Sequence, residues 1–156
     1  MEREVPGSLT ATVWLVRAVV AWSGLVALLT YVFRDDLVLT WAEGNKAAQA
    51  ILDEGGLDAL RESSINIPNF VPLALVLFVV YAGLIGVLVV FVRAGHGWAR
   101  VALTATVLFV VFATGVGMAR AIPPLFVGLS VVALGLNAAI LVCLWHRDTS
   151  AYLRAD

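Results

Sequence analysis

The sequence predicts an all-α membrane protein, with four transmembrane helices and a short helical extracytoplasmic cap between the first two. Hydrophobic residues make up 62% of the 156 positions and charged residues only 13%. The mean hydropathy of +0.97 lies outside the range of soluble domains. Two runs without a charged residue, Phe70 to Val92 and Val101 to Met118, are each long enough to cross about 30 Å of hydrocarbon. Only a short turn joins them, so we expect an antiparallel hairpin.

The first span is expected over residues 11–33. Trp14 and Trp22 lie toward one end and Tyr31 toward the other, which is typical of membrane interfaces. The run contains Arg17 and has no small-residue cleavage site before its aromatic end, which indicates a retained span rather than a signal peptide. The long side chain of Arg17 can carry its guanidinium back to the lipid headgroups, or it can pair with a group from another helix or subunit.

Residues 34–67 form the one long polar segment, with seven acidic and three basic residues. Leu37, Trp41 and Ile51 recur at helical spacing, so they are expected on the apolar face of a single helix. The glycine pair at residues 55–56 is expected to end this helix before a second, shorter one. The sequence therefore predicts an amphipathic cap that lies on the membrane surface or over the mouth of the bundle.

The second and third spans are expected over residues 70–92 and 98–118. Gly83 and Gly86 form a strip of small residues in the second span. Lipid tails are as apolar as leucine, so helices in a bilayer associate through close backbone approach and hydrogen bonds. The strip is therefore expected to be a helix-packing face.

The fourth span is expected over residues 124–145, and it starts at a Pro-Pro pair that suits a helix N-terminus. Gly135 and Ala139 form a small-xxx-small step, with Gly128 earlier in the span and Asn137 on an adjoining part of the same surface. This side is expected to make a tight helix contact, in which Asn137 forms a hydrogen bond between helices. A polar pore lining is the alternative role for Asn137.

Four spans place both ends of the chain on one side of the membrane, and residues 1–156 are expected to form one transmembrane domain with a tail over residues 146–156. Six arginines then fall on the side of the termini, against four basic residues on the other. Cytoplasmic segments carry an excess of basic residues, so we expect a bacterial inner-membrane protein with cytoplasmic termini. The six are Arg3, Arg17, Arg93, Arg100, Arg147 and Arg154.

No catalytic, metal-binding or cofactor-binding constellation stands out. No Asp or Glu lies in an expected span, whereas ion-coupled transport normally needs one there. His96 and His146 lie at span ends, which does not suit a haem held between helices, and the single cysteine, Cys143, cannot form a disulfide within the chain. Scattered basic residues and a net charge of −1 argue against a nucleic-acid partner. We therefore expect no enzyme activity and no cofactor.

The stretch from Arg93 to Thr104 begins as a basic, glycine-rich turn and enters the third span through Trp98 and Arg100. It resembles a turn in many small, uncharacterised multi-span membrane proteins of actinobacteria, which share this Ala/Val/Arg/Gly-rich composition. The resemblance implies a bacterial inner-membrane protein and transfers no activity or site residue. Physically, Trp98 is expected to anchor the chain at the interface, while Arg93, Arg100 and Arg17 face headgroup phosphates.

These observations favour a non-catalytic accessory, scaffold or binding subunit of a larger membrane complex. Its expected partners are other membrane subunits or a second copy of itself, together with membrane lipids. The main alternative is a small transporter or channel for a lipid or another apolar molecule, with a cavity that reaches Tyr81, Asn137 or the threonines of the third span. A sensor that receives its signal through residues 34–67, and an enzyme that borrows catalytic groups from a partner, are the remaining alternatives.

Overall fold

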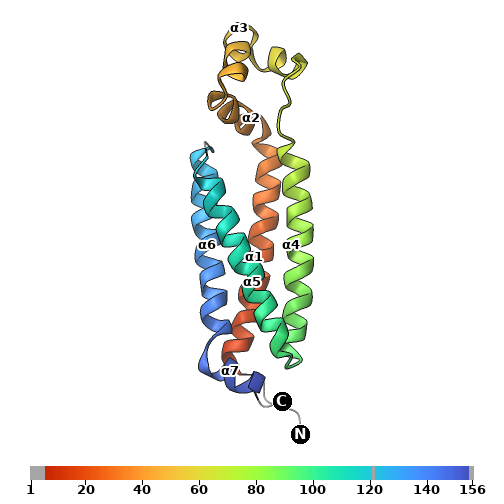
Figure 1. Ribbon diagram of the computed structural model, residues 1–156, viewed down its shortest axis with the longest axis vertical. Coiled ribbons are helices and arrows are strands. Elements are labelled where there is room, and N and C mark those ends of the chain that lie inside the picture. Colours follow the sequence, from red (N-terminus) through yellow and green to blue (C-terminus); the bar gives the residue numbers. More distant parts are fainter. Residues whose placement is uncertain (1–5, 121, 155–156) are drawn as a thin grey trace.

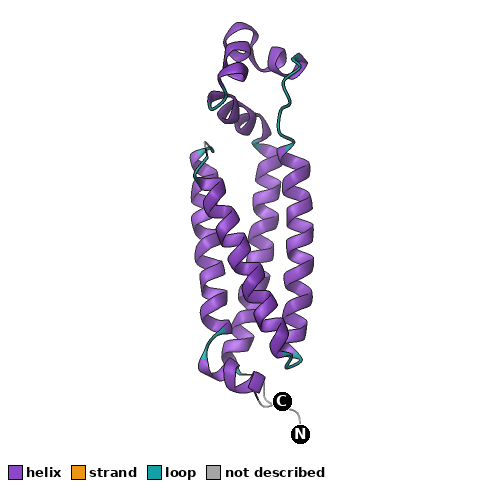
Figure 2. Ribbon diagram, viewed as in Figure 1, coloured by secondary structure: helices purple, strands orange, loops and turns teal. Residues whose placement is uncertain are grey.

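The computed structural model describes residues 6–120 and 122–154, which form seven helices joined by short loops (Figures 1 and 2). Two short helices lie between the first two long ones, and a third follows the last, so the expected all-α fold with four candidate spans is confirmed. The chain is a multi-pass membrane protein. Arg3, one of the six arginines expected on the side of the termini, lies outside the described residues. The long helices are α1 (Gly7–Val32), α4 (Phe70–Arg93), α5 (Gly97–Met118) and α6 (Pro124–Leu144), and the short ones are α2 (Arg34–Glu43), α3 (Lys46–Glu62) and α7 (Arg147–Arg154).

The long helices begin and end within four residues of the expected span limits. Their lengths run from 21 to 26 residues, or about 32–39 Å at about 1.5 Å per residue, which exceeds the hydrocarbon thickness of about 30 Å. The turn after α4 contains Gly95 with a φ of 92°, a left-handed conformation that glycine adopts without steric cost. Pro124 opens α6, where its missing N–H would have had no partner within the helix.

The four long helices form a bundle in which α1 packs against both α4 and α6, and α5 packs against the same two helices (Figure 1). Pairs α1/α5 and α4/α6 therefore occupy the two diagonals. Helix α5 crosses the bundle obliquely: it starts beside α4 at the end that carries the chain termini and finishes beside α6 at the cap end. As a consequence, α4 and α5 diverge toward the cap.

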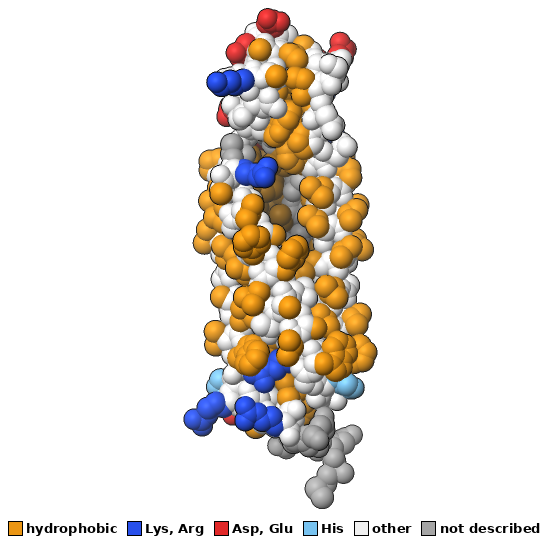
Figure 3. All heavy atoms as spheres, viewed as in Figure 1, with side chains coloured by type: hydrophobic (Ala, Val, Ile, Leu, Met, Phe, Trp, Pro, Cys, Tyr) orange, Lys and Arg blue, Asp and Glu red, His pale blue; other side chains and the backbone are white. Residues whose placement is uncertain are grey.

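The bundle is packed most tightly at the end that carries the termini. Buried residues of the main core lie in the first half of α1, the second half of α4, the first half of α5 and the second half of α6, and include Val16, Val89, Leu103 and Ile140. Because successive long helices run in opposite directions, all four of these halves meet at that end. Toward the cap, the surface is hollowed on the face shown in Figure 3.

The first cap helix, which the spacing predicts to run unbroken from Leu37 past Ile51 to the glycine pair, is divided into two, so its predicted continuity is wrong. Helix α2 ends at Glu43 and α3 begins at Lys46. Between them, the Asn45 side chain accepts hydrogen bonds from the backbone N–H groups of Ala47 and Ala48. An asparagine at this position stabilises a new helix start by pairing N–H groups that have no partner within the helix.

The expected apolar face of the cap still points into the cap. Trp41 and Ile51 pack against a small core around Leu60, whereas Leu37 is buried without belonging to that core. Gly56 has a φ of 72° and interrupts α3, at the glycine pair where a break was expected. The cap stands beyond the ends of α1 and α4, and acidic side chains gather over it (Figures 1 and 3).

Candidate functional site

A hydrogen bond between side chains links α4 to α6 inside the bundle. The Tyr81 hydroxyl donates to Asn137 Oδ1 at 2.8 Å, and Asn137 Nδ2 donates to the carbonyl oxygen of Ala133 at 2.8 Å. Asn137 is only 2% exposed. Helices α4 and α6 lie diagonally opposite each other, so this hydrogen bond crosses the interior of the bundle. It lies near mid-bundle, between the tightly packed half at the termini and the half below the cap. This is the interhelical hydrogen bond expected of Asn137, and its partner is Tyr81.

A double-mutant cycle with Tyr81→Phe and Asn137→Leu should give a coupling energy of about 0.6–1.7 kcal/mol, the range of hydrogen bonds between transmembrane helices. Either single change leaves the other polar group without this partner in an apolar interior. The free energy of unfolding by SDS in mixed micelles measures the cycle. A coupling below about 0.3 kcal/mol, which lies within the additivity of independent sites, would show that the two groups do not act together.

The glycines expected to pack helices together do not do so within this chain. A Cβ added at Gly83, Gly86, Gly128 or Gly135 would meet no neighbouring atom within 4 Å. That expectation is therefore corrected for contacts inside the bundle, and a contact with another chain stays a prediction. Helices that are apolar on all sides have no polar face to mark the outside, so small residues alone do not show which side faces inward.

The placement of Asn137 and Gly135 on one surface is also wrong. Asn137 points into the bundle, whereas Gly135 is exposed and Ala139 is half-buried. Successive residues of an α-helix are about 100° apart, so residues two apart face different sides. The outward side of α6 therefore contains the glycines, and its inward side contains the asparagine.

The close approach of helices occurs instead at Gly24 of α1, which the sequence interpretation did not single out. A Cβ at Gly24 would lie 3.3 Å from two ring atoms of Phe78 in α4. Nearby, the indole Nε1 of Trp22 donates to the carbonyl oxygen of Leu129 in α6 at 3.0 Å. Trp22 therefore lies near the middle of α1 and not toward its end, where an interface residue was expected. Helix α1 is thus the element that holds α4 and α6 together in the half below the cap.

Three of the four expected headgroup anchors are exposed. Trp98 is 56% exposed, and Arg17 and Arg93 are exposed too. The Cζ atom of Arg17 lies 4.9 Å from the centroid of the Trp14 ring. Trp14 precedes Arg17 by nearly one turn, so the Arg17 side chain is directed toward the end that carries the termini.

Arg100 is held by the chain itself rather than standing free toward phosphates. Its Nη2 donates to Ser150 Oγ at 3.0 Å, and its Cζ lies 3.8 Å from the centroid of the Trp145 ring. The Trp145 indole in turn donates to Thr104 Oγ1 at 3.0 Å. Arg100 therefore fastens α7 to α5, which departs from the expected role of a lipid anchor.

The segment after α6, expected as a polar tail, forms helix α7 and closes one end of the bundle. Thr149 is fully buried; its hydroxyl donates to the carbonyl oxygen of Cys143 at 3.1 Å and lies 2.8 Å from Ser8 Oγ of α1. The Tyr152 hydroxyl donates to the carbonyl oxygen of Arg93 at 2.9 Å. These contacts join α7 to α1, α4 and α6.

An open groove of about 490 Å³ lies between α1 and α4 on the outside of the bundle, and we call it the α1/α4 groove. Half of the residues that line it are valines, including Val16, Val20 and Val89, and Gly86 leaves open space in it. The two arginines of these helices, Arg17 and Arg93, also line it. No acidic residue is among the lining residues that the structure describes.

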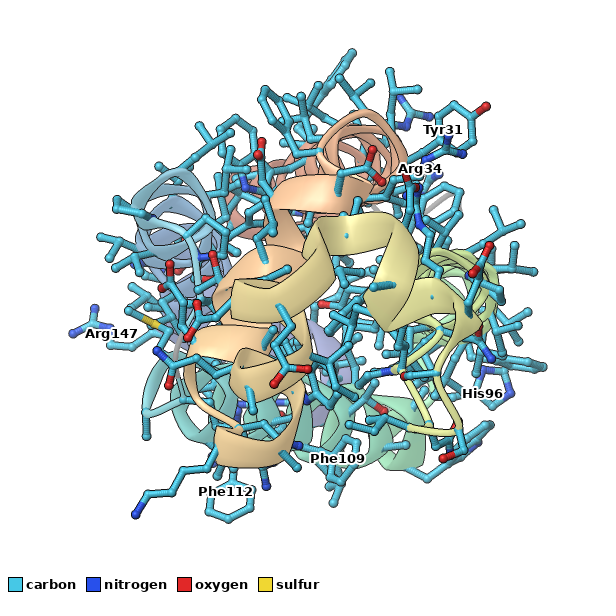
Figure 4. All side chains as sticks on the ribbon, turned by 90° about the horizontal axis from the view of Figure 1, so that it is seen from above. Tyr31, Arg34, His96, Phe109, Phe112 and Arg147 are labelled. Carbon is cyan, nitrogen blue, oxygen red and sulfur yellow. The ribbon has the colours of Figure 1, made fainter. Side chains whose placement is uncertain are left out.

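Among the described residues, no group of three or more His, Cys, Asp or Glu side chains could hold a metal ion. His146 lies beside Asp148, with 3.2 Å between its Nδ1 and Asp148 Oδ2. His96 stacks edge-on against Phe91 at the turn after α4. Seen from the cap, His96 and Arg147 lie on opposite sides of the bundle (Figure 4), so the two histidines belong to separate surface regions.

No protein-family model, curated protein or solved structure matches the chain. The resemblance of the turn to proteins of actinobacteria stays a prediction, and the function has to be inferred from the geometry of the bundle.

Proposed function

We propose that this protein is a non-catalytic accessory or scaffold subunit of a larger bacterial membrane complex, which binds other membrane subunits or a second copy of itself through its helix surfaces. The observation that carries the proposal is a pair of exposed glycines on the outward side of α6. Gly128 and Gly135 lie there, and a Cβ at either would meet no neighbouring atom within 4 Å. Seven residues separate them, about two helical turns, so both lie on one side of the helix.

Such a surface suits a helix of another chain. In a bilayer, small residues let two backbones approach closely, and the van der Waals packing that results replaces the hydrophobic driving force that water would supply. Gly83 on α4 is exposed with the same open space around it. The small residues that make no contact within the bundle are therefore free to pack against a helix outside it.

The buried polar groups support a structural rather than a catalytic interior. Catalytic groups are usually presented to a cleft with a partner that tunes them. Here, every buried polar side chain among the described residues bonds within the chain, mostly to a backbone carbonyl one turn away. These side chains are Thr12, Thr30, Asn137 and Thr149.

The charge distribution supports an orientation with both termini in the cytoplasm. Basic side chains gather at the end that carries the termini, and acidic side chains gather over the cap (Figure 3). Because cytoplasmic segments are enriched in Lys and Arg, the cap is expected to face the outside of the inner membrane.

A pair of substitutions tests the proposed surface. Gly128→Leu combined with Gly135→Leu should leave the protein folded, since neither side chain would meet the rest of the bundle, but should abolish co-purification of a stoichiometric partner or of a second tagged copy in mild detergent. Gly115→Leu on α5 is the matched control, because a Cβ at Gly115 would also meet no atom within 4 Å. Repeated recovery of the wild-type chain alone would contradict the proposal. An equal loss of co-purification in the control would show that α6 is not the specific binding surface.

A transporter or channel for a lipid or another apolar molecule is the second candidate. The divergence of α4 and α5 toward the cap, with the hollow below the cap (Figures 1 and 3), favours it. Its path is expected to reach Tyr81 and Asn137, whose hydrogen bond crosses the interior of the bundle. Purified protein in vesicles should then accelerate transfer of a fluorescent lipid between leaflets. Transfer rates equal to those of protein-free vesicles would exclude this lipid transport and favour the subunit role.

A further inference from the structure

The α1/α4 groove combines an apolar wall with cationic groups toward one end. Its volume of about 490 Å³ lies within the roughly 300–1,000 Å³ of ordinary small-molecule sites. Val16 and Val20 of α1 and Val89 of α4 line it, and Gly86 provides open space on the α4 side. Because the groove is open to the side of the bundle, lipid tails are the apolar molecules that reach it first.

The two arginines of the groove lie toward the same end. Arg93 is the last residue of α4, and Arg17 is in the third turn of α1, which runs in the opposite direction. The contact of Arg17 with Trp14 directs its guanidinium toward the end where Arg93 lies. An arginine guanidinium offers several N–H donors that match the geometry of phosphate oxygens. Two such groups, with no acidic residue among the described residues that line the groove, favour a ligand with a net negative head.

We infer that the α1/α4 groove binds one anionic phospholipid, with an acyl chain along the valine walls and the headgroup phosphate between Arg17 and Arg93. An acyl chain beside Gly86 fills space that no protein side chain occupies. A zwitterionic lipid carries the same phosphate, but its own cation would face two arginines without a carboxylate to balance it. The site therefore selects lipids by headgroup charge, and this selection is independent of the proposed subunit role.

Lipid titrations of the purified protein, followed by native mass spectrometry, test the headgroup half of the site. The probes are phosphatidylglycerol and phosphatidylcholine with identical acyl chains. The wild type should bind phosphatidylglycerol at least about tenfold more tightly. An arginine near the membrane surface is worth about fivefold in affinity for an anionic lipid, so Arg17→Gln and Arg93→Gln should each lose about that factor. The double variant should lose the preference.

Arg147→Gln is the matched control for charge, because Arg147 is an exposed arginine that does not line the groove. It should bind both lipids as the wild type does. Retained preference in the double arginine variant would overturn the site. A loss in Arg147→Gln as large as that in Arg17→Gln would show that only the general surface charge attracts the lipid, and would overturn it as well.

Substitutions that fill the groove test its acyl-chain half. Gly86→Leu should weaken binding of both lipids severalfold, since its side chain would occupy the open space. Gly83→Leu on the same helix lies outside the groove and should have no effect. Ala82→Leu, which fills the groove one turn away from Gly86, gives an independent readout if Gly86→Leu is poorly folded. Unchanged binding in both groove variants would refute the placement of the acyl chain.

Discussion

Shortening Leu103 to alanine is expected to lower the free energy of unfolding by about 1–3 kcal/mol, whereas Leu108→Ala on the same helix should change it by less than about 0.5 kcal/mol. Leu103 is fully buried in the main core, and Leu108 is 52% exposed. In a bilayer both side chains stay in an apolar environment when the helices separate, so the transfer part of the usual penalty is small. What remains is the cavity and the loss of dispersion attraction, which only the buried Leu103 experiences.

Unfolding by SDS in mixed micelles measures both substitutions on one scale. Equal losses at the two positions would show that α5 is packed on both sides, and would contradict the exposure of Leu108.

Gly24→Leu should also destabilise the bundle by about 1–3 kcal/mol, the usual cost of forcing extra atoms into a packed contact. The first atom of the new side chain would already lie 3.3 Å from the Phe78 ring, so α1 and α4 would have to separate. Gly83→Leu is the control, because that position is open, and its effect should stay within about 0.5 kcal/mol.

Truncation of the neighbour separates steric crowding from other causes. If Phe78 is the obstacle, Phe78→Ala should restore part of the stability lost in Gly24→Leu, and the two substitutions should show a favourable coupling. Additive losses in the double variant would mean that Gly24 matters for a reason other than its contact with Phe78.

The transmembrane helices are predictable from the sequence because the bilayer interior restricts which structures can cross it. A membrane span must form its backbone hydrogen bonds within itself and cross about 30 Å of hydrocarbon. For an apolar run such as Phe70 to Val92, the α-helix is the local structure that meets both conditions. Short turns then force the hairpin order. For the same reason Asn137, a polar group in an apolar run, could be assigned a hydrogen bond between helices before its partner was known.

The faces of the helices were not predictable from the same runs. When lipid and core are equally apolar, a helix such as α6 lacks the polar stripe that shows which side is outside. Gly135 therefore looked like a packing residue within the chain and proved to be exposed, while Gly24, with no distinguishing pattern, holds the close contact with Phe78.

The water-facing parts departed from the sequence interpretation through single polar side chains. Asn45 restarts the helix in the cap, and Thr149 and Tyr152 fasten α7 to the bundle. Each makes a local or long-range hydrogen bond that periodicity does not encode. The apolar cap residue Trp41, by contrast, points inward as its spacing predicted.

Photo-crosslinking from position 135 in native membranes tests the central claim, that the outward side of α6 binds another protein chain. A photoreactive residue in place of Gly135 should give one discrete crosslink to a protein, whereas the same residue in place of Phe109, which is 70% exposed on α5 and projects away from the bundle (Figure 4), should react with lipid. Crosslinks to lipid alone at both positions would contradict the account.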